Sequence, residues 1–185
     1  MNLQTDSSIS NLKYGLYVVS TPIGNLDDIS LRALKVLSNS DYILCEDTRV
    51  TKKLLTKYKI KTNLISNHKF NEKKNLFKVI DILNNNKVVS LVSDAGTPTI
   101  SDPGNILIKE CIKRKINVIP IPGPSAPITA LSITGFSEKY YFYGFFPEKN
   151  SEIKKNFQIL SKLDTSIVFF ISAKKLAKSV GIIKK

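Results

Sequence analysis

The feature that most constrains the fold is the segment 91–104, LVSDAGTPTISDPG, in which an apolar run ends in a loop of Asp, Gly, Thr and Pro. Before the loop, Val88 to Val92 are mostly β-branched, a pattern typical of a strand covered on both faces in a parallel sheet. After it, Asp102 and Pro103 have the order of an N-cap followed by proline at the first helical position. The segment predicts an interior strand, a loop and a helix.

The loop itself, residues 94–101, would lie at the carboxyl end of that strand. Ligands bind at this edge in open α/β sheets. Gly96 would also let a ligand approach the backbone closely. The alternative is a turn made of turn-forming residues, and the pattern alone favours the two interpretations equally.

Strands and helices alternate along most of the chain. Strands are predicted at residues 15–20, 41–45, 63–66, 88–92 and 117–121. Apolar residues at helical spacing lie between and after them, at residues 31–37, 50–58, 72–83, 107–112 and 128–134. Repeated strand–helix–strand crossovers require a parallel sheet with helices on its faces. The sequence therefore predicts an α/β fold with a mostly parallel N-terminal sheet flanked by helices.

The composition changes after Gly135, where we place a domain boundary. The expected organisation is a flexible leader at 1–13, an N-terminal α/β domain at 14–135 and a partial C-terminal α/β domain at 136–185. The second domain opens with an aromatic strand at 140–146, which is more typical of core packing than of base stacking. Two strands and two helices enclose little apolar surface, so this domain is expected to depend on the first or to be incomplete.

Three of the loops that follow predicted strands contain small residues, at Pro22, Asp94 and Pro122. Because the carboxyl ends of parallel strands share one edge, these loops should converge on one crevice. Neither the GxGxxG fingerprint nor the GxxxxGK[ST] loop occurs in the sequence. Their absence argues against a standard dinucleotide site and against a P-loop nucleotide hydrolase.

The loop after the second strand is charged, with the sequence Glu46-Asp47-Thr48-Arg49. The spacing alone favours a structural role, in which Asp47 or Thr48 caps the next helix beside a salt bridge. The functional interpretation is a carboxylate for proton transfer and a guanidinium for a phosphate. His68 is the only histidine, and nothing in the spacing identifies a partner for it.

The formal net charge of +13 predicts an anionic partner, for which a large RNA is a natural choice. Only three of the 28 basic residues are arginines. Lysine supplies charge without the bidentate fork of arginine, so the excess favours polyanion attraction over specific readout, and compositional drift is an alternative explanation.

The sequence also bears on location and redox state. No apolar run approaches the ~20 residues of a membrane span, and the start of the chain lacks the apolar stretch of a secretory signal, so we expect a cytoplasmic protein. Cys45 and Cys111 have no metal-ligand spacing and are expected to be reduced core residues.

Five segments in order resemble the tetrapyrrole-methylase-like family and, within it, the branch that methylates ribosomal RNA of the small subunit. These segments are LYVVSTPIGNLDDISLRAL, ILCEDTR, LVSDAGTPTISDPG, IPGPSA and YFYGFFP. The resemblance implies an S-adenosylmethionine-dependent enzyme that methylates the ribose 2′-hydroxyl of a cytidine in 16S rRNA or in the 30S subunit. It also implies two α/β domains with the cofactor between them, a homodimer and no metal.

Residue by residue, the resemblance assigns cofactor binding to the three small-residue loops. The positions are Pro22, Gly24, Asn25, Ser93, Asp94, Ala95, Gly96, Thr97, Pro98, Pro122, Gly123, Ser125 and Ala126. It places the substrate at the charged loop, where Glu46 or Asp47 would accept or orient the hydroxyl proton and Arg49 would hold a phosphate. Methyl transfer from a sulfonium is an in-line displacement, so the attacking oxygen must be deprotonated and aligned.

The chain departs from the family pattern at three places, one of which is the segment 169–175, where relatives resemble FYESPHR and this chain reads FFISAKK. Relatives often have two histidines before an Asn-Glu pair, whereas here His68 matches the first and Phe70 replaces the second. Relatives also continue through further strands beyond the point where this chain stops, at Lys185. The alternatives are a methyltransferase acting on a tetrapyrrole precursor, a shortened RNA-binding remnant without catalysis, and a metabolic enzyme with another nucleotide-like ligand.

Overall fold

The computed structural model describes residues 12–183, so most of the predicted leader lies outside the described residues. The chain divides into two compact units, 1–125 and 126–185. This division falls before the boundary expected near Gly135, because the helix α5 (Ala126–Ser132) belongs with the second unit. Each unit is described by itself.

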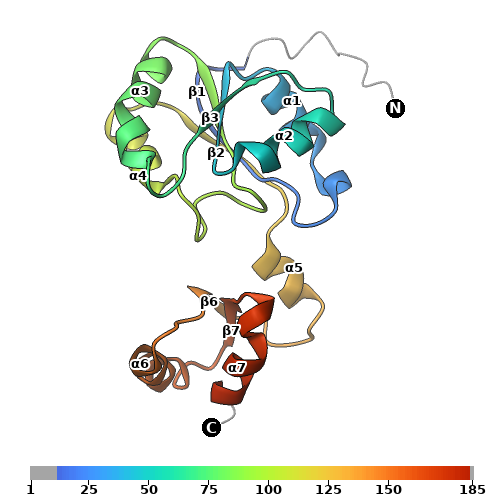
Figure 1. Ribbon diagram of the computed structural model, residues 1–185, viewed down its shortest axis with the longest axis vertical. Coiled ribbons are helices and arrows are strands. Elements are labelled where there is room, and N and C mark those ends of the chain that lie inside the picture. The colour runs from blue at the N-terminus through green and yellow to red at the C-terminus, as the bar shows by residue number, and fades with distance from the viewer. Residues whose placement is uncertain (1–11, 184–185) are drawn as a thin grey trace. The chain divides into compact units, whose positions relative to one another are not determined.

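The first unit is a five-stranded parallel sheet in the order β3-β2-β4-β1-β5 (Figure 1). Its strands are β1 (Gly15–Val19), β2 (Tyr42–Cys45), β3 (Asn63–Ser66), β4 (Val88–Leu91) and β5 (Val118–Ile121). Its helices are the short 3-10 helix η2 (Leu26–Asp28), α1 (Leu31–Ser38), α2 (Thr48–Lys57), α3 (Glu72–Asn84) and α4 (Asn105–Lys113). The predicted parallel α/β architecture is confirmed.

The strand β4 lies at the centre of the sheet. Leu91 pairs with Val18 of β1 on one side and with Leu44 of β2 on the other. All four residues of β4 are buried, as its nearly unbroken apolar pattern predicted. Pro120, by contrast, lies in the edge strand β5, where its missing N–H costs no ladder hydrogen bond on the outer side.

Helices cover both faces of the sheet, and two buried clusters lie between the layers. One cluster joins the sheet to α1 and α2, and the other joins it to α3 and α4. Alternate residues of β1 enter different clusters, with Leu16 in the second and Tyr17 in the first. Cys45 and Cys111 are both buried and free, and burial raises the pKa of Cys111 to about 11.

This layering creates a divergence at the carboxyl edge of the sheet. The chain leaves β1 toward α1 on one face, whereas it leaves the neighbouring strand β4 toward α4 on the other face. Adjacent loops that run to opposite faces open a crevice, which is where ligands bind in sheets of this class.

The start of α4 corrects the sequence prediction. Asp102 and Pro103 do not cap this helix, which begins at Asn105 with Gly104 as its N-cap at φ 124°. The carboxylate of Glu72, on α3, accepts hydrogen bonds from the backbone N–H groups of Gly104 (3.0 Å) and Ile106 (3.1 Å). A long-range side chain therefore satisfies the N–H groups that a local cap would have satisfied.

The second unit contains a parallel two-stranded sheet covered by helices. Its elements after α5 are β6 (Tyr140–Phe145), α6 (Asn150–Leu160), β7 (Ser166–Phe170) and α7 (Ala173–Ile183). The aromatic strand is only partly core, contrary to expectation: Phe142 lies 4.9 Å from Phe170 and Phe146 lies 5.4 Å from Phe169, between ring centroids. Tyr140, Tyr141 and Phe145 are exposed, because the two-stranded sheet encloses little apolar surface. No helix within residues 12–183 has both the length and the hydropathy needed to cross a membrane.

The conformation of Gly104 gives a test of the α4 start. A Cβ at this position would lie 2.6 Å from Cδ2 of Leu91, and its φ of +124° is strained for any side chain. We expect Gly104→Ala to lower the free energy of unfolding by about 2 kcal/mol or more in urea titrations. The control is Gly24→Ala, where the added Cβ meets nothing within 4 Å. Equal stability of the two variants would contradict the assignment.

The contact of Glu72 gives a second test. Glu72→Ala would leave two backbone N–H groups without their acceptor, so we expect a loss of about 2 kcal/mol in the free energy of unfolding. The matched control is Glu110→Ala on α4, whose carboxylate pairs with Arg114 at the surface and should contribute about 0.5 kcal/mol. If Glu72→Ala were no worse than Glu110→Ala, the capping role would be wrong.

Candidate functional site

Two of the three predicted loops are joined by backbone hydrogen bonds at the divergence of β1 and β4. Thr21 N–H donates to Gly96 O (2.9 Å), and Gly96 N–H donates to Thr21 O (3.0 Å). The hydroxyl of Thr21 also donates to Ser93 O (3.1 Å). The first and central loops therefore form one rigid surface.

The third loop joins the same surface through Thr97. Its hydroxyl donates to Pro124 O at 3.1 Å and lies 3.1 Å from the hydroxyl of Ser20. Gly123 packs so tightly that an added Cβ would lie 2.9 Å from Cβ of Ser20. The convergence predicted from the sequence thus holds for residues 21–25, 93–98 and 122–125.

The predicted cofactor residues differ in exposure. Those that face solvent are Gly24, Asn25, Asp94, Ala95, Pro122 and Gly123. Those that are buried or half-buried are Pro22, Ser93, Gly96, Thr97, Pro98 and Ser125. Ala126, the last of the set, opens α5 and belongs to the second unit. The exposed group offers contacts to a ligand, while the buried group holds the loops in place.

Carboxylates gather beside these loops. Asp47 N–H donates to Oδ1 of Asp94 at 3.0 Å, which links the charged loop after β2 to the loop after β4. Burial raises the pKa of Glu46, the charge of Asp94 raises it further, and His68 lowers it. The pKa of Asp102 is also raised, to about 6. Burial is the largest cause, and the negative charge of Glu46 is the second.

Asp102 was not predicted as a site residue, because its position before Pro103 resembles a helix cap. The structure instead places its carboxyl group half-buried at the carboxyl edge. Glu72 was also missed, because a buried glutamate that contacts another helix has no local signature. The one available signal for Asp102 was its place in the loop after the central strand.

Asp47 and Arg49 form a local pair. Asp47, rather than Thr48, is the N-cap of α2: its Oδ1 accepts from the backbone N–H of Arg49 (2.8 Å), and the guanidinium of Arg49 lies 2.6 Å from Oδ2. The hydrogen bonds from Arg49 lower the pKa of Asp47 to about 2. The Arg49 side chain is 87% exposed, so its guanidinium is held by Asp47 and still faces solvent.

His68 and Glu46 follow adjacent strands. The strands β2 and β3 end in register, with Cys45 opposite Ser66, and Asn67 N–H donates to Cys45 O at 2.8 Å. Glu46 directly follows Cys45 and His68 follows Ser66 by two residues, so both lie at the carboxyl edge of the sheet. This proximity was not apparent from the sequence spacing.

The first unit encloses little volume at this edge. A cavity of about 40 Å³ lies among eight residues: Thr21, Pro22, Leu26, Val50, Thr51, Leu54, Ser93 and Asp94. Ligand pockets measure about 300–1,000 Å³, so the loops present a surface rather than an enclosed pocket. Among the described residues, no group of three or more His, Cys, Asp or Glu side chains is arranged to hold a metal ion.

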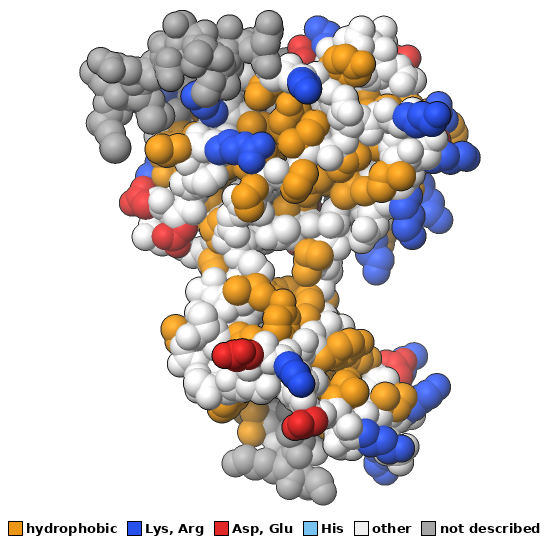
Figure 2. All heavy atoms as spheres, turned by 180° about the vertical axis from the view of Figure 1, so that it is seen from behind, with side chains coloured by type: hydrophobic (Ala, Val, Ile, Leu, Met, Phe, Trp, Pro, Cys, Tyr) orange, Lys and Arg blue, Asp and Glu red, His pale blue; other side chains and the backbone are white. Residues whose placement is uncertain are grey.

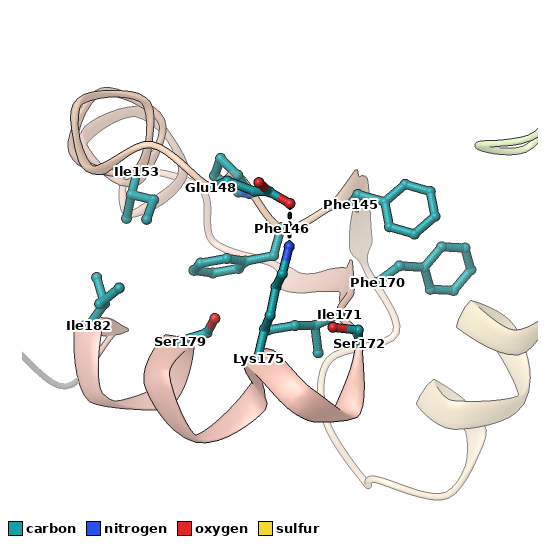
Figure 3. Close-up of a pocket in the computed structure, with 11 residues that line it drawn as sticks. Phe145, Phe146, Glu148, Ile153, Phe170, Ile171, Ser172, Lys175, Ser179 and Ile182 are labelled. Carbon is teal, nitrogen blue, oxygen red and sulfur yellow. Dashed lines mark hydrogen bonds and ion pairs between the residues drawn. The ribbon is translucent and has the colours of Figure 1, made fainter. Parts of the chain in front are cut away.

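A larger cavity, of about 340 Å³, lies within the second unit (Figure 3). Its walls are mainly aromatic and aliphatic side chains from β6, β7, α6 and α7. Its two charged groups, Glu148 and Lys175, are paired with each other, and Lys175 lowers the pKa of Glu148. None of the sequence-predicted site residues lines it, so we do not assign the chemistry to this cavity.

The raised pKa of Asp102 predicts a pH dependence of stability. Between its ordinary value of 3.8 and about 6, the folded chain holds this proton more tightly than the unfolded chain does. The contribution of Asp102 therefore becomes less favourable as pH rises through that range. We expect Asp102→Asn to be more stable than the wild type in urea at about pH 8, with the difference disappearing near pH 4. A difference that does not vary with pH would contradict this.

Comparisons with known proteins agree with this geometry. Residues 15–184 match the family of Tetrapyrrole (Corrin/Porphyrin) Methylases. A "Ribosomal RNA small subunit methyltransferase I" of Mesomycoplasma conjunctivae is 49% identical over 168 residues, which cover 90% of this chain and 70% of the relative. The protein of the same name from Mesorhizobium japonicum is 43% identical over 179 residues, covering 96% of this chain and 61% of the relative. The chain therefore spans about two thirds of the length of such relatives.

Solved structures share the fold at low sequence identity. A uroporphyrin III C-methyltransferase from Thermus thermophilus superposes with a TM-score of 0.64 at 12% identity, covering 91% of this chain and 76% of that structure. A diphthine synthase gives a TM-score of 0.62 at 18% identity, covering 85% and 64%. These likenesses show the fold, and the match of the family model over residues 15–184 shows that the chain belongs to the tetrapyrrole (corrin/porphyrin) methylase family.

Proposed function

We propose that this chain methylates the ribose 2′-hydroxyl of a cytidine in 16S rRNA, with S-adenosylmethionine as the methyl donor. The observation that carries the proposal is the meeting, at one sheet edge, of the hydrogen-bonded loops at 21–25 and 93–98 with the Glu46–Arg49 loop. Relatives 43–49% identical are named ribosomal RNA small subunit methyltransferase I, which supports an rRNA substrate.

The loop surface suits a cationic cofactor. Gly24 and Asn25 are exposed, and the space around Gly24 is open, so a ligand can reach the backbone there. Asp94 is exposed and its Oδ1 is oriented by the N–H of Asp47, which leaves a carboxylate facing solvent for a hydroxyl or ammonium group. The bound sulfonium supplies an electrophilic methyl group. The nearby carboxylates favour this positive charge.

Of the two carboxylates in the charged loop, Glu46 is the better proton acceptor. The pKa of Asp47 is lowered to about 2 by Arg49, so its conjugate base is weak and its oxygens are already engaged. The pKa of Glu46 is raised, first by burial and then by the charge of Asp94. A carboxylate with a raised pKa accepts a proton from a hydroxyl more readily. We assign Glu46 to the 2′-hydroxyl and Asp47 to holding Arg49.

We assign Arg49 to binding the RNA substrate. Its guanidinium is fixed near the α2 N-terminus by Asp47 and remains 87% exposed. A fixed, exposed guanidinium can bind a phosphate next to the target ribose through two parallel hydrogen bonds. This contact would draw the RNA backbone past a carboxylate-rich edge that otherwise repels it.

The assignment of Glu46 is tested by methyl transfer from labelled S-adenosylmethionine to undermodified 30S subunits. We expect the wild-type chain to yield 2′-O-methylcytidine on nucleoside analysis. Glu46→Gln should lower kcat by about 10²–10⁴-fold, because it removes the proton acceptor while keeping the shape. Calorimetric titration should show unchanged S-adenosylmethionine affinity for this variant.

The matched control is Glu110→Gln, a carboxylate on α4 that pairs with Arg114 and should leave kcat unchanged. Undiminished transfer by Glu46→Gln would overturn the role of Glu46. Methylation of a base, or no transfer by a folded chain that binds the cofactor, would overturn the proposed reaction.

A further inference from the structure

Phe70 is the most exposed large apolar side chain among the described residues, with 92% of its surface accessible. It lies in the loop between β3 and α3, which follows a strand end at the carboxyl edge. Phenylalanine is normally among the most buried residue types.

The loop that presents Phe70 is held by its own hydrogen bonds. The Asn71 side chain accepts from His68 N–H (2.7 Å) and donates to Ser66 O (3.1 Å). Asn71 N–H donates to His68 O (3.0 Å), and Phe70 N–H donates to Nδ1 of His68 (3.3 Å). The aromatic ring is therefore carried on an ordered backbone, which lowers the entropy cost of using it for binding.

Three lysines flank the ring, at Lys69, Lys73 and Lys74, and all three are exposed. Within residues 12–183, none of them forms an ion pair with a carboxylate. In Figure 2, basic side chains gather on the side of the first unit where α3 and α4 lie in Figure 1. The surroundings of Phe70 are thus cationic, unlike the carboxylate-rich loops after β2 and β4.

The segment that carries Phe70 begins beside the proposed catalytic carboxylate. Asn67 N–H donates to the carbonyl of Cys45, the residue before Glu46, and His68 and Phe70 follow along the same segment. The ring contacts His68 with centroids 6.0 Å apart. A nucleotide strand that reaches Glu46 could extend directly across this loop.

We propose that Phe70 stacks on an unpaired base of the RNA substrate while Lys69, Lys73 and Lys74 contact its phosphates. A single exposed ring among cations suits single-stranded RNA, whose bases stack on aromatic side chains and whose backbone needs positive charge. A protein partner would require a continuous apolar patch instead. The proposal rests on the proposed function for the identity of the substrate, and it adds a base-stacking contact outside the cofactor loops.

The test measures binding of the full chain to a fluorescein-labelled, unstructured single-stranded RNA by anisotropy. Phe70→Ala should weaken binding by about 5- to 150-fold, the range for losing one base stack, while Phe70→Trp should retain affinity. The matched control is Phe77→Ala, which removes a phenylalanine that is 75% exposed about two turns along α3. Phe77→Ala should bind as the wild type does.

Salt dependence separates the two parts of the contact. Replacing Lys69, Lys73 and Lys74 together by Gln should reduce the slope of log affinity against log salt by about 2, because about 0.7 counterions are released per phosphate of a single strand. Phe70→Ala should keep the wild-type slope, since stacking releases no counterions. Thermal melting of each variant checks that the exposed substitutions leave the fold intact.

Different results would contradict the stacking contact of Phe70 and the proposed methyl transfer. Wild-type affinity in Phe70→Ala, equal losses in Phe70→Ala and Phe77→Ala, or no RNA binding by the wild type would each overturn the stacking contact. Phe70-dependent binding without methyl transfer to 30S subunits would support the contact and count against the proposed reaction. With active enzyme, Phe70→Ala should raise KM for the 30S subunit and leave kcat nearly unchanged.

Discussion

Burial of β4 between β1 and β2 is the constraint on which the candidate site depends. A parallel strand with neighbours on both sides must be apolar on both faces, and the chain must leave its carboxyl end toward a covering helix. Here the helix after β4 lies on the opposite face from those after β1 and β2. The loops at 21–25 and 93–98 therefore diverge from adjacent strand ends, and hydrogen bonds between Thr21 and Gly96 hold their bases together.

Acidic and basic side chains lie at different positions along the carboxyl edge of the sheet. Around the proposed cofactor loops, burial and then the charge of Asp94 raise the pKa of Glu46, and burial and then the charge of Glu46 raise the pKa of Asp102. Lysines dominate one strand position further out, around Phe70 after β3, and Arg49 follows β2 in the same segment as Glu46. A cationic cofactor and a polyanionic substrate need opposite fields, and a gradient along one sheet edge can serve both. The net charge of +13 alone could not have shown this arrangement.

Long-range contacts account for what sequence reasoning missed at the site. Glu72 reads as the first residue of an amphipathic helix, yet its carboxylate caps α4 from 32 residues away in the chain. Asp102 reads as the cap of that helix, yet it is free to join the carboxylate cluster because Glu72 has taken its role. Local propensity could not distinguish these outcomes, because a cap by a distant side chain satisfies the same N–H groups. Of the two caps left open for α2, the structure uses Asp47.

Periodicity and loop composition were sufficient to determine the alternating strands and helices, the interior position of β4 and the convergence of three small-residue loops. Each of these follows from local burial patterns and from the geometry of parallel crossovers. The aromatic run at 140–146 was expected to be core, but only its pairing with rings of β7 holds, and Tyr140, Tyr141 and Phe145 remain exposed. Only the tertiary structure decided which acidic group has a raised pKa and which is a salt-bridge partner. Those roles depend on burial and on charges from other strands, as the opposite pKa shifts of the adjacent residues Glu46 and Asp47 show.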